Sequence, residues 1–155
     1  MKINISSYDI FLSLIPIISG YIAAYLCPIR KNYNTNIKLN LEPPKYVFKI
    51  IWPILYILIG ICWSWINKTS YGLENFISNL LFGILNLSLI LWIFVYGCQK
   101  NTKLSLYIII FILGMSISTT IFVSKHNKYA SLLLSPFICW IFLASLLNYS
   151  IVAIT

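Results

Sequence analysis

Acidic residues are nearly absent from this sequence, which has only 3 Asp and Glu against 11 Lys and Arg in 155 residues. A soluble domain usually carries about 25% charged residues, whereas this chain has 9% charged and 60% hydrophobic residues. Such a chain cannot cover a surface that faces water. The composition therefore excludes a soluble globular domain, a disordered tail and a small disulfide scaffold.

The residues of ordinary catalysis are also scarce. His126 is the only histidine, and Asp9, Glu42 and Glu74 are too far apart in the sequence to form a carboxylate pair. The cysteines stand in four different apolar runs, with no CxxC spacing: Cys27, Cys62, Cys98 and Cys139. These absences argue against a metal site, a required cofactor and a conventional hydrolase, kinase or metalloenzyme. We expect the four cysteines to be buried, reduced thiols.

Five long apolar runs dominate the chain. They cover about residues 10–27, 46–66, 76–96, 104–123 and 129–154. A membrane-spanning helix needs about 20 apolar residues, whereas strands of a membrane barrel alternate between polar and apolar residues. We read the first run as a retained span rather than a cleaved signal peptide, because it is long and follows Asp9. The sequence predicts an all-α, multi-pass membrane protein with a single domain, 1–155, of five transmembrane helices.

Most basic residues occupy the gaps between the runs, where we expect them to act as topology signals and contact lipid headgroups rather than nucleic acid. Four lie on the N-terminal side of the membrane: Lys2, Lys68, Lys125 and Lys128. Seven lie on or near the opposite side: Arg30, Lys31, Lys38, Lys45, Lys49, Lys100 and Lys103. The excess predicts that the long loop after the first helix faces the cytoplasm.

Aromatic residues form stripes at helical spacing within two of the runs. Phe48, Trp52 and Tyr56 follow one another at i, i+4, and Trp140 stands near the middle of the fifth run with Ala144 four residues later. Two such stripes either pack against each other or line a cavity for a flat apolar ligand. Trp63 and Trp65, near the end of the second run, are expected at the membrane interface.

Asn86 and Asn148 are two of the asparagines that lie within the apolar runs. Asn86 falls near mid-bilayer, and Asn148 lies nearer the end of the fifth run. An amide at this depth forms a hydrogen bond with a neighbouring helix or contacts a ligand, and the first alternative is favoured.

Two sequence motifs resemble those of the translocator protein family, also called TspO/MBR, tryptophan-rich sensory proteins or peripheral-type benzodiazepine receptors. Residues 43–60 read PPKYVFKIIWPILYILIG, similar to the family pattern PPxxVFxxVWxxLYxxxG. Residues 136–148 read PFICWIFLASLLN, similar to PYxxWxxFAxxLN. The chain departs from the family at Leu41 and Leu89, where tryptophan is common. The resemblance extends over essentially the whole chain.

The resemblance implies a five-helix bundle, often dimeric, that binds porphyrin or haem, synthetic drugs and, in some members, sterols. It implies ligand-binding roles for seven residues: Trp52, Trp140, Phe48, Tyr56, Pro44, Asn86 and Ala144. Binding or transport of a flat hydrophobic ligand is the favoured function. Light-dependent porphyrin degradation through tryptophan and a membrane scaffold with a vestigial pocket are the alternatives.

Overall fold

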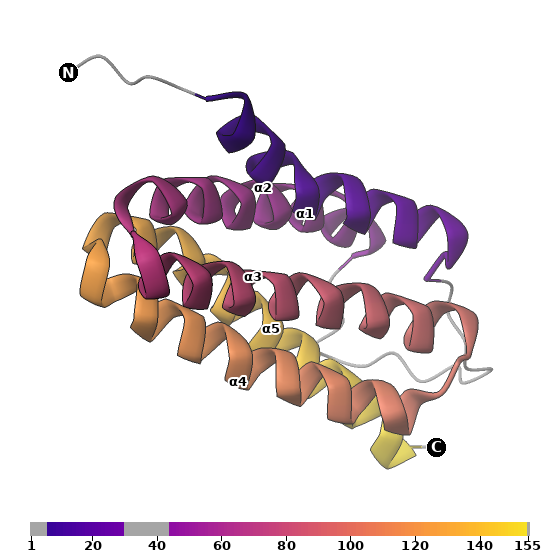
Figure 1. Ribbon diagram of the computed structural model, residues 1–155. Helices are drawn as coiled ribbons and strands as arrows, with labels where there is room; N and C mark the ends of the chain where they lie inside the picture. The colour runs from indigo at the N-terminus through magenta and orange to yellow at the C-terminus, as the bar shows by residue number, and fades with distance from the viewer. Residues whose placement is uncertain (1–5, 30–43, 155) are drawn as a thin grey trace.

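The computed structural model describes residues 6–29 and 44–154, and these residues form a bundle of long helices (Figure 1). The helices are α1, Ser7–Leu26; α2, Lys45–Thr69; α3, Gly72–Ile93; α4, Thr102–His126; and α5, Lys128–Ile154. A short π-helical segment, η1 (Phe94–Cys98), continues α3. All five helices are long and apolar enough to cross a membrane. The prediction of an all-α protein with five such helices is confirmed.

Polar residues in the short connections set where the helices begin. Ser6 caps α1, and Asp9 completes a capping box by accepting a 2.8 Å hydrogen bond from the Ser6 backbone N–H. Asn101 accepts a 3.0 Å hydrogen bond from the Leu104 N–H at the start of α4. Asn127 caps α5 by accepting a 2.9 Å hydrogen bond from the Tyr129 N–H. These caps satisfy backbone donors that have no partner within the helix.

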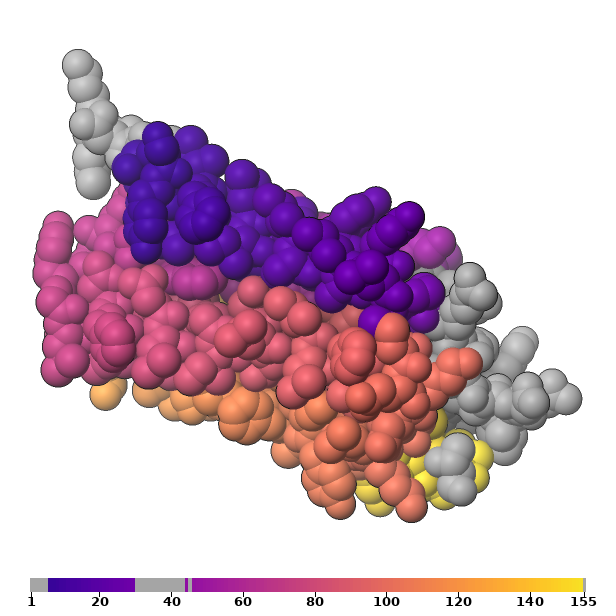
Figure 2. All heavy atoms as spheres, turned by 45° about the vertical axis from the view of Figure 1, so that its right-hand side comes forward, coloured from indigo at the N-terminus to yellow at the C-terminus, as the bar shows by residue number. Residues whose placement is uncertain are grey.

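Helix α1 is the peripheral member of the bundle and packs mainly on α2. Figure 2 shows it in indigo along the outer edge of the molecule. Small residues allow its close approach: a Cβ at Gly60 would collide with the Ser13 carbonyl oxygen, and one at Gly20 would meet the Tyr56 ring at 2.6 Å. The remaining helices are packed as α3 on α4, α4 on α5 and α5 on α2.

Two polar contacts link the helix ends on the N-terminal face of the bundle. Lys68 at the end of α2 lies 3.0 Å from Asp9 at the start of α1. His126 at the end of α4 lies 3.1 Å from Glu74 at the start of α3. Each contact joins a helix end to the beginning of a helix that packs beside it, so this face is held together by side chains.

On the opposite face, Cys27 and Cys98 form a disulfide between the end of α1 and η1, with their Cα atoms 4.9 Å apart. The prediction of four buried, reduced thiols is therefore wrong for this pair. It is also wrong for Cys139, which is exposed; only Cys62 is a buried thiol. The pairing escapes sequence reasoning because 71 positions separate the two cysteines.

Trp63 lies inside the bundle, contrary to the prediction of an interfacial position. Its side chain is 6% exposed and stacks on Phe82, with ring centroids 5.6 Å apart. Its indole N–H donates a 2.7 Å hydrogen bond to the side-chain oxygen of Asn79 on α3. The prediction failed because α2 continues to Thr69 and carries Trp63 more than a turn inside the helix. Trp65 is 39% exposed.

Candidate functional site

The aromatic stripe of α2 faces α3 and α5, and Trp52 lies at its centre. The Trp52 ring centroid is 5.7 Å from Tyr56, 5.8 Å from Trp92 on α3 and 6.4 Å from Trp140 on α5. The i, i+4 spacing places Trp52 and Tyr56 on one side of α2, so that both rings point toward the same neighbours. Three helices, α2, α3 and α5, thus meet at one indole.

Two further rings extend this arrangement. Phe48 makes an edge contact with Trp140 at 5.3 Å, and Tyr96 stacks on Trp92 at 5.2 Å. We refer to the six rings as the aromatic cluster: Phe48, Trp52, Tyr56, Trp92, Tyr96 and Trp140. Aromatic pairs of these geometries each contribute about 0.5–1.5 kcal/mol beyond the area they bury. The cluster is therefore a stable, continuous wall of flat side chains.

Three polar groups of the aromatic cluster are buried without a hydrogen-bond partner in the described part of the chain. They are the Tyr56 hydroxyl and the indole N–H groups of Trp92 and Trp140. The three side chains are only 5%, 6% and 8% exposed. A buried donor without an acceptor costs about 1–3 kcal/mol. The cluster thus offers hydrogen-bond donors that an incoming acceptor would satisfy.

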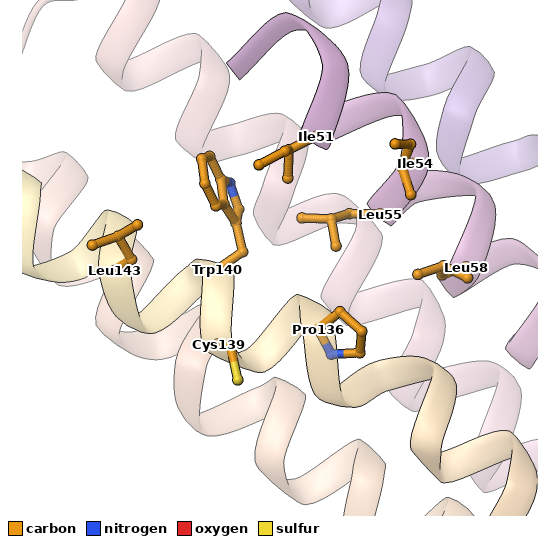
Figure 3. Close-up of a pocket in the computed structure, with 8 residues that line it drawn as sticks. All are labelled: Ile51, Ile54, Leu55, Leu58, Pro136, Cys139, Trp140 and Leu143. Atoms are coloured by element: carbon orange, nitrogen blue, oxygen red, sulfur yellow. The ribbon is translucent and has the colours of Figure 1, made fainter. Parts of the chain in front are cut away.

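An apolar pocket of about 520 Å³ lies beside the aromatic cluster, between α2 and α5 (Figure 3). Its lining has no charged side chain and consists of Ile51, Ile54, Leu55, Leu58, Pro136, Cys139, Trp140 and Leu143. Figure 3 shows the Trp140 ring standing between the two helices. Ile54, Pro136 and Cys139 are exposed, so the pocket opens toward the outside of the bundle.

Comparison with known proteins assigns the chain to a family. The TspO/MBR family profile matches residues 12–154. The chain belongs to the TspO/MBR family. The tryptophan-rich protein TspO of Chlorobaculum tepidum is 29% identical over 126 residues, which cover 77% of this chain and 76% of that protein. The protein of the same name from Archaeoglobus fulgidus is 32% identical over 109 residues, 70% of each chain. With its five apolar helices, this TspO/MBR member is an integral membrane protein.

The structure brings together four of the seven residues for which the resemblance to the family implies ligand-binding roles. Phe48, Trp52, Tyr56 and Trp140 all belong to the aromatic cluster. Of the seven, only Trp140 also lines the pocket. Both motif segments contribute to the pocket, but most of its lining residues are not among the seven.

The other three residues lie in different surroundings. Pro44 is the exposed residue that precedes α2, and Ala144 is buried on α5 one turn after Trp140. Asn86 donates a 3.1 Å hydrogen bond to the Ser19 hydroxyl of α1, in agreement with the favoured interhelical role. Asn148 likewise lies 3.1 Å from the Ser105 hydroxyl of α4. Leu41 and most of the basic first loop lie outside the described residues.

Trp92 and Tyr96 were missed by sequence reasoning. The family pattern directs attention to residue 89, where this chain has leucine, and Trp92 lies nearly one turn further along α3. A signal was present, since Leu85, Leu89, Trp92 and Tyr96 follow the 4-3-4 spacing of one helix face. Among residues 6–29 and 44–154, no group of three His, Cys, Asp or Glu side chains could hold a metal ion.

Proposed function

We propose that this protein binds and transports a flat hydrophobic small molecule, such as a porphyrin or haem, at the aromatic cluster. The observation that supports the proposal best is the set of three unpartnered donors on buried rings, Tyr56, Trp92 and Trp140. Burying such donors costs free energy in the empty protein. A flat ligand with oxygen or nitrogen acceptors would offset that cost while it stacks on the indole rings.

The dimensions of the adjacent pocket agree with this proposal. Pockets for small molecules commonly measure about 300–1,000 Å³ and are lined mainly by apolar side chains; the pocket beside Trp140 has about 520 Å³. Because it opens between two membrane-spanning helices, a ligand dissolved in the bilayer would reach Trp140 without crossing water. The rings of the cluster would then separate to admit a larger macrocycle.

The basic first loop has a complementary role in the proposal. Arg30, Lys31 and Lys38 belong to this loop by sequence and lie outside the described residues. Positive charge attracts acidic ligands over distances up to about one Debye length, which is about 8 Å at physiological ionic strength. The carboxylates of a porphyrin would thus remain near the basic face while its ring enters the apolar bundle.

A fluorescence titration with protoporphyrin IX in detergent micelles tests the proposal. Porphyrin bound at the aromatic cluster should quench tryptophan emission saturably, and Trp52→Phe and Trp140→Phe should each remove part of the quenching. Trp140→Ala should weaken binding about tenfold, since aromatic stacking contributes about 1–3 kcal/mol per ring. The matched control is Trp65→Phe, an exposed tryptophan outside the cluster. Equal losses at Trp65 and Trp140 would refute binding at this cluster.

Cys139 provides a second, independent measurement at the pocket. It is an exposed free thiol that lines the pocket one residue before Trp140, whereas Cys62 is buried. Bound protoporphyrin should slow the alkylation of Cys139 by N-ethylmaleimide in proportion to occupancy. An unchanged alkylation rate at saturating porphyrin would show that the ligand leaves the pocket open.

Photo-oxidation of porphyrin is the second candidate function, and one observation favours it. Trp140, Trp52, Trp92 and Tyr96 form a chain of oxidisable rings with successive centroids 6.4, 5.8 and 5.2 Å apart. An excited bound porphyrin would take an electron from Trp140, and the electron vacancy would then pass along these rings from Trp140 toward Tyr96. Illumination of the complex distinguishes the candidates: a carrier returns porphyrin unchanged, whereas a photo-oxidase yields a product with a new absorption spectrum.

A further inference from the structure

The Cys27–Cys98 disulfide joins the peripheral helix α1 to η1, at the end of the bundle where both segments finish (Figure 1). The backbone also brings these segments together, because a Cβ at Gly97 would collide with the Cys27 carbonyl oxygen. The glycine next to Cys98 therefore allows the two sulfur atoms to meet. The two cysteines are held in bonding position by the packing of their helices as well as by the bond.

Basic residues follow both cysteines in the sequence. Arg30 and Lys31 come shortly after Cys27, and Lys100 and Lys103 come shortly after Cys98. These residues belong to the larger set of seven on this side of the membrane, against four on the other side. The positive-inside rule predicts that the face carrying the disulfide is cytoplasmic. Thiols in the cytosol are normally kept reduced, and disulfides that form there are usually transient or redox-sensing.

From this placement we infer that Cys27 and Cys98 are a reversible redox pair, which a peroxide closes and a cytosolic dithiol opens. Cys98 is exposed, whereas Cys27 is 5% exposed, so the oxidant reaches Cys98 first. Cys27 is the resolving thiol. The modification site is separate from the aromatic cluster and does not depend on the ligand proposed above.

The chemistry requires only these two thiols and the peroxide. Peroxide oxidises the Cys98 thiol to a sulfenic acid and is itself reduced to water. The Cys27 sulfur then attacks the Cys98 sulfur, the S–S bond forms and the S–O bond breaks. The leaving hydroxide takes the Cys27 proton and departs as a second water. A dithiol reverses the bond by exchange, returning two protein thiols and becoming a disulfide itself.

Closure of the pair connects the peripheral helix to the aromatic cluster. The described helix α1 is the least buried span, with 22% of its apolar window buried against 50% for Gly72–Cys98. Tyr96, two residues before Cys98, stacks on Trp92. Oxidation therefore fastens the end of α1 to the segment that positions one side of the cluster, and reduction releases it.

Thiol trapping in living cells tests the redox pair directly. The variant Cys62→Ser/Cys139→Ala leaves Cys27 and Cys98 as the remaining cysteines. Cells are quenched in acid before and after exposure to hydrogen peroxide, and the denatured protein is then treated with a polyethylene-glycol maleimide. We expect two labels in unstressed cells, none after peroxide and two again after the peroxide is removed. A pair that is already closed in unstressed cells, or still open after peroxide, would overturn the inference.

Single variants test the assigned order of oxidation. In Cys27→Ser, the Cys98 sulfenic acid has no resolving thiol and should be captured by dimedone after peroxide treatment. In Cys98→Ser, the buried Cys27 should be captured several-fold less. Equal capture in the two variants would contradict the roles assigned to the two thiols.

A topology measurement in the same cells tests the compartment. We expect an Asn36→Cys variant of the chain lacking all four native cysteines to react with a membrane-impermeant maleimide only after permeabilisation. Labelling of Asn36→Cys in intact cells would place this face outside the cytoplasm and overturn the redox proposal.

Discussion

Trp63 and Trp92 form a pair that tests whether the unpaired donors of the aromatic cluster lower the free energy of unfolding. Both side chains are 6% exposed; Trp63 stacks on Phe82, and Trp92 stacks on Trp52 and Tyr96. They differ at the indole N–H, which donates to Asn79 in Trp63 and has no partner in Trp92. Substitution by phenylalanine keeps most of the stacking area and removes only the N–H and part of the ring.

The free energies of the two substitutions should differ mainly by their hydrogen-bond contributions. Trp63→Phe loses a hydrogen bond and leaves the oxygen of the half-buried Asn79 without its indole partner, whereas Trp92→Phe removes a buried donor that was already unpaired. Phenylalanine keeps most of the stacking at both positions, with one neighbouring ring at Trp63 and two at Trp92, so the smaller ring costs little in either variant. Trp63→Phe should therefore lower the free energy of unfolding by about 1–3 kcal/mol more than Trp92→Phe. For a chain of this length, that corresponds to about 2–12 °C in apparent Tm.

The assay is unfolding of the ligand-free protein in mixed micelles with increasing sodium dodecyl sulfate, followed by circular dichroism. Trp65→Phe is the control for an exposed ring and should change the free energy of unfolding little. In porphyrin titrations the order should reverse, with Trp92→Phe weakening binding and Trp63→Phe leaving it nearly unchanged. Equal destabilisation by Trp63→Phe and Trp92→Phe would refute the claim that the Trp92 N–H has no hydrogen-bond partner in the ligand-free protein.

Two further predictions concern the packing that positions the cluster. Gly60→Ala should lower the free energy of unfolding by about 1–3 kcal/mol, because the added methyl collides with Ser13 of α1; Gly114→Ala, which meets open space, should not lower it in the same SDS titration. Asn86→Leu removes the hydrogen bond to Ser19 and should cost about 0.6 kcal/mol by the same measurement. A loss above about 2 kcal/mol would show that Asn86 does more than join α3 to α1.

The bundle itself could be predicted from the sequence because each helix is an uninterrupted apolar run. The observed helices extend beyond several of the predicted runs, since polar residues continue the helix after the hydrocarbon-like segment ends. Ser6 and Asn127 determine two of these boundaries through capping hydrogen bonds. A hydropathy pattern detects the apolar segment of a helix but not the polar residues that cap its ends. The predicted helix boundaries were therefore less accurate than the predicted number of helices.

The sequence predicted only those residues of the candidate site that belong to a family motif or to an aromatic stripe. Trp52 and Trp140 stand at motif positions, and the structure brings their rings to 6.4 Å. Trp92 joins them through the packing of α3, which no local pattern specifies. The partnership of Cys27 with Cys98 is similarly a property of tertiary structure. Local spacing predicts which face a residue occupies, whereas contacts between faces depend on how the helices pack.

The most direct test of ligand binding at the aromatic cluster is to follow the five indole N–H resonances of the ¹⁵N-labelled protein as protoporphyrin IX is added. The resonances of Trp52, Trp92 and Trp140 should shift saturably, with the two unpartnered donors, Trp92 and Trp140, moving toward the hydrogen-bonded range. Those of Trp63, already bonded to Asn79, and of the exposed Trp65 should stay in place. Saturable shifts confined to Trp65, or no shift at Trp92 and Trp140, would contradict binding at the cluster.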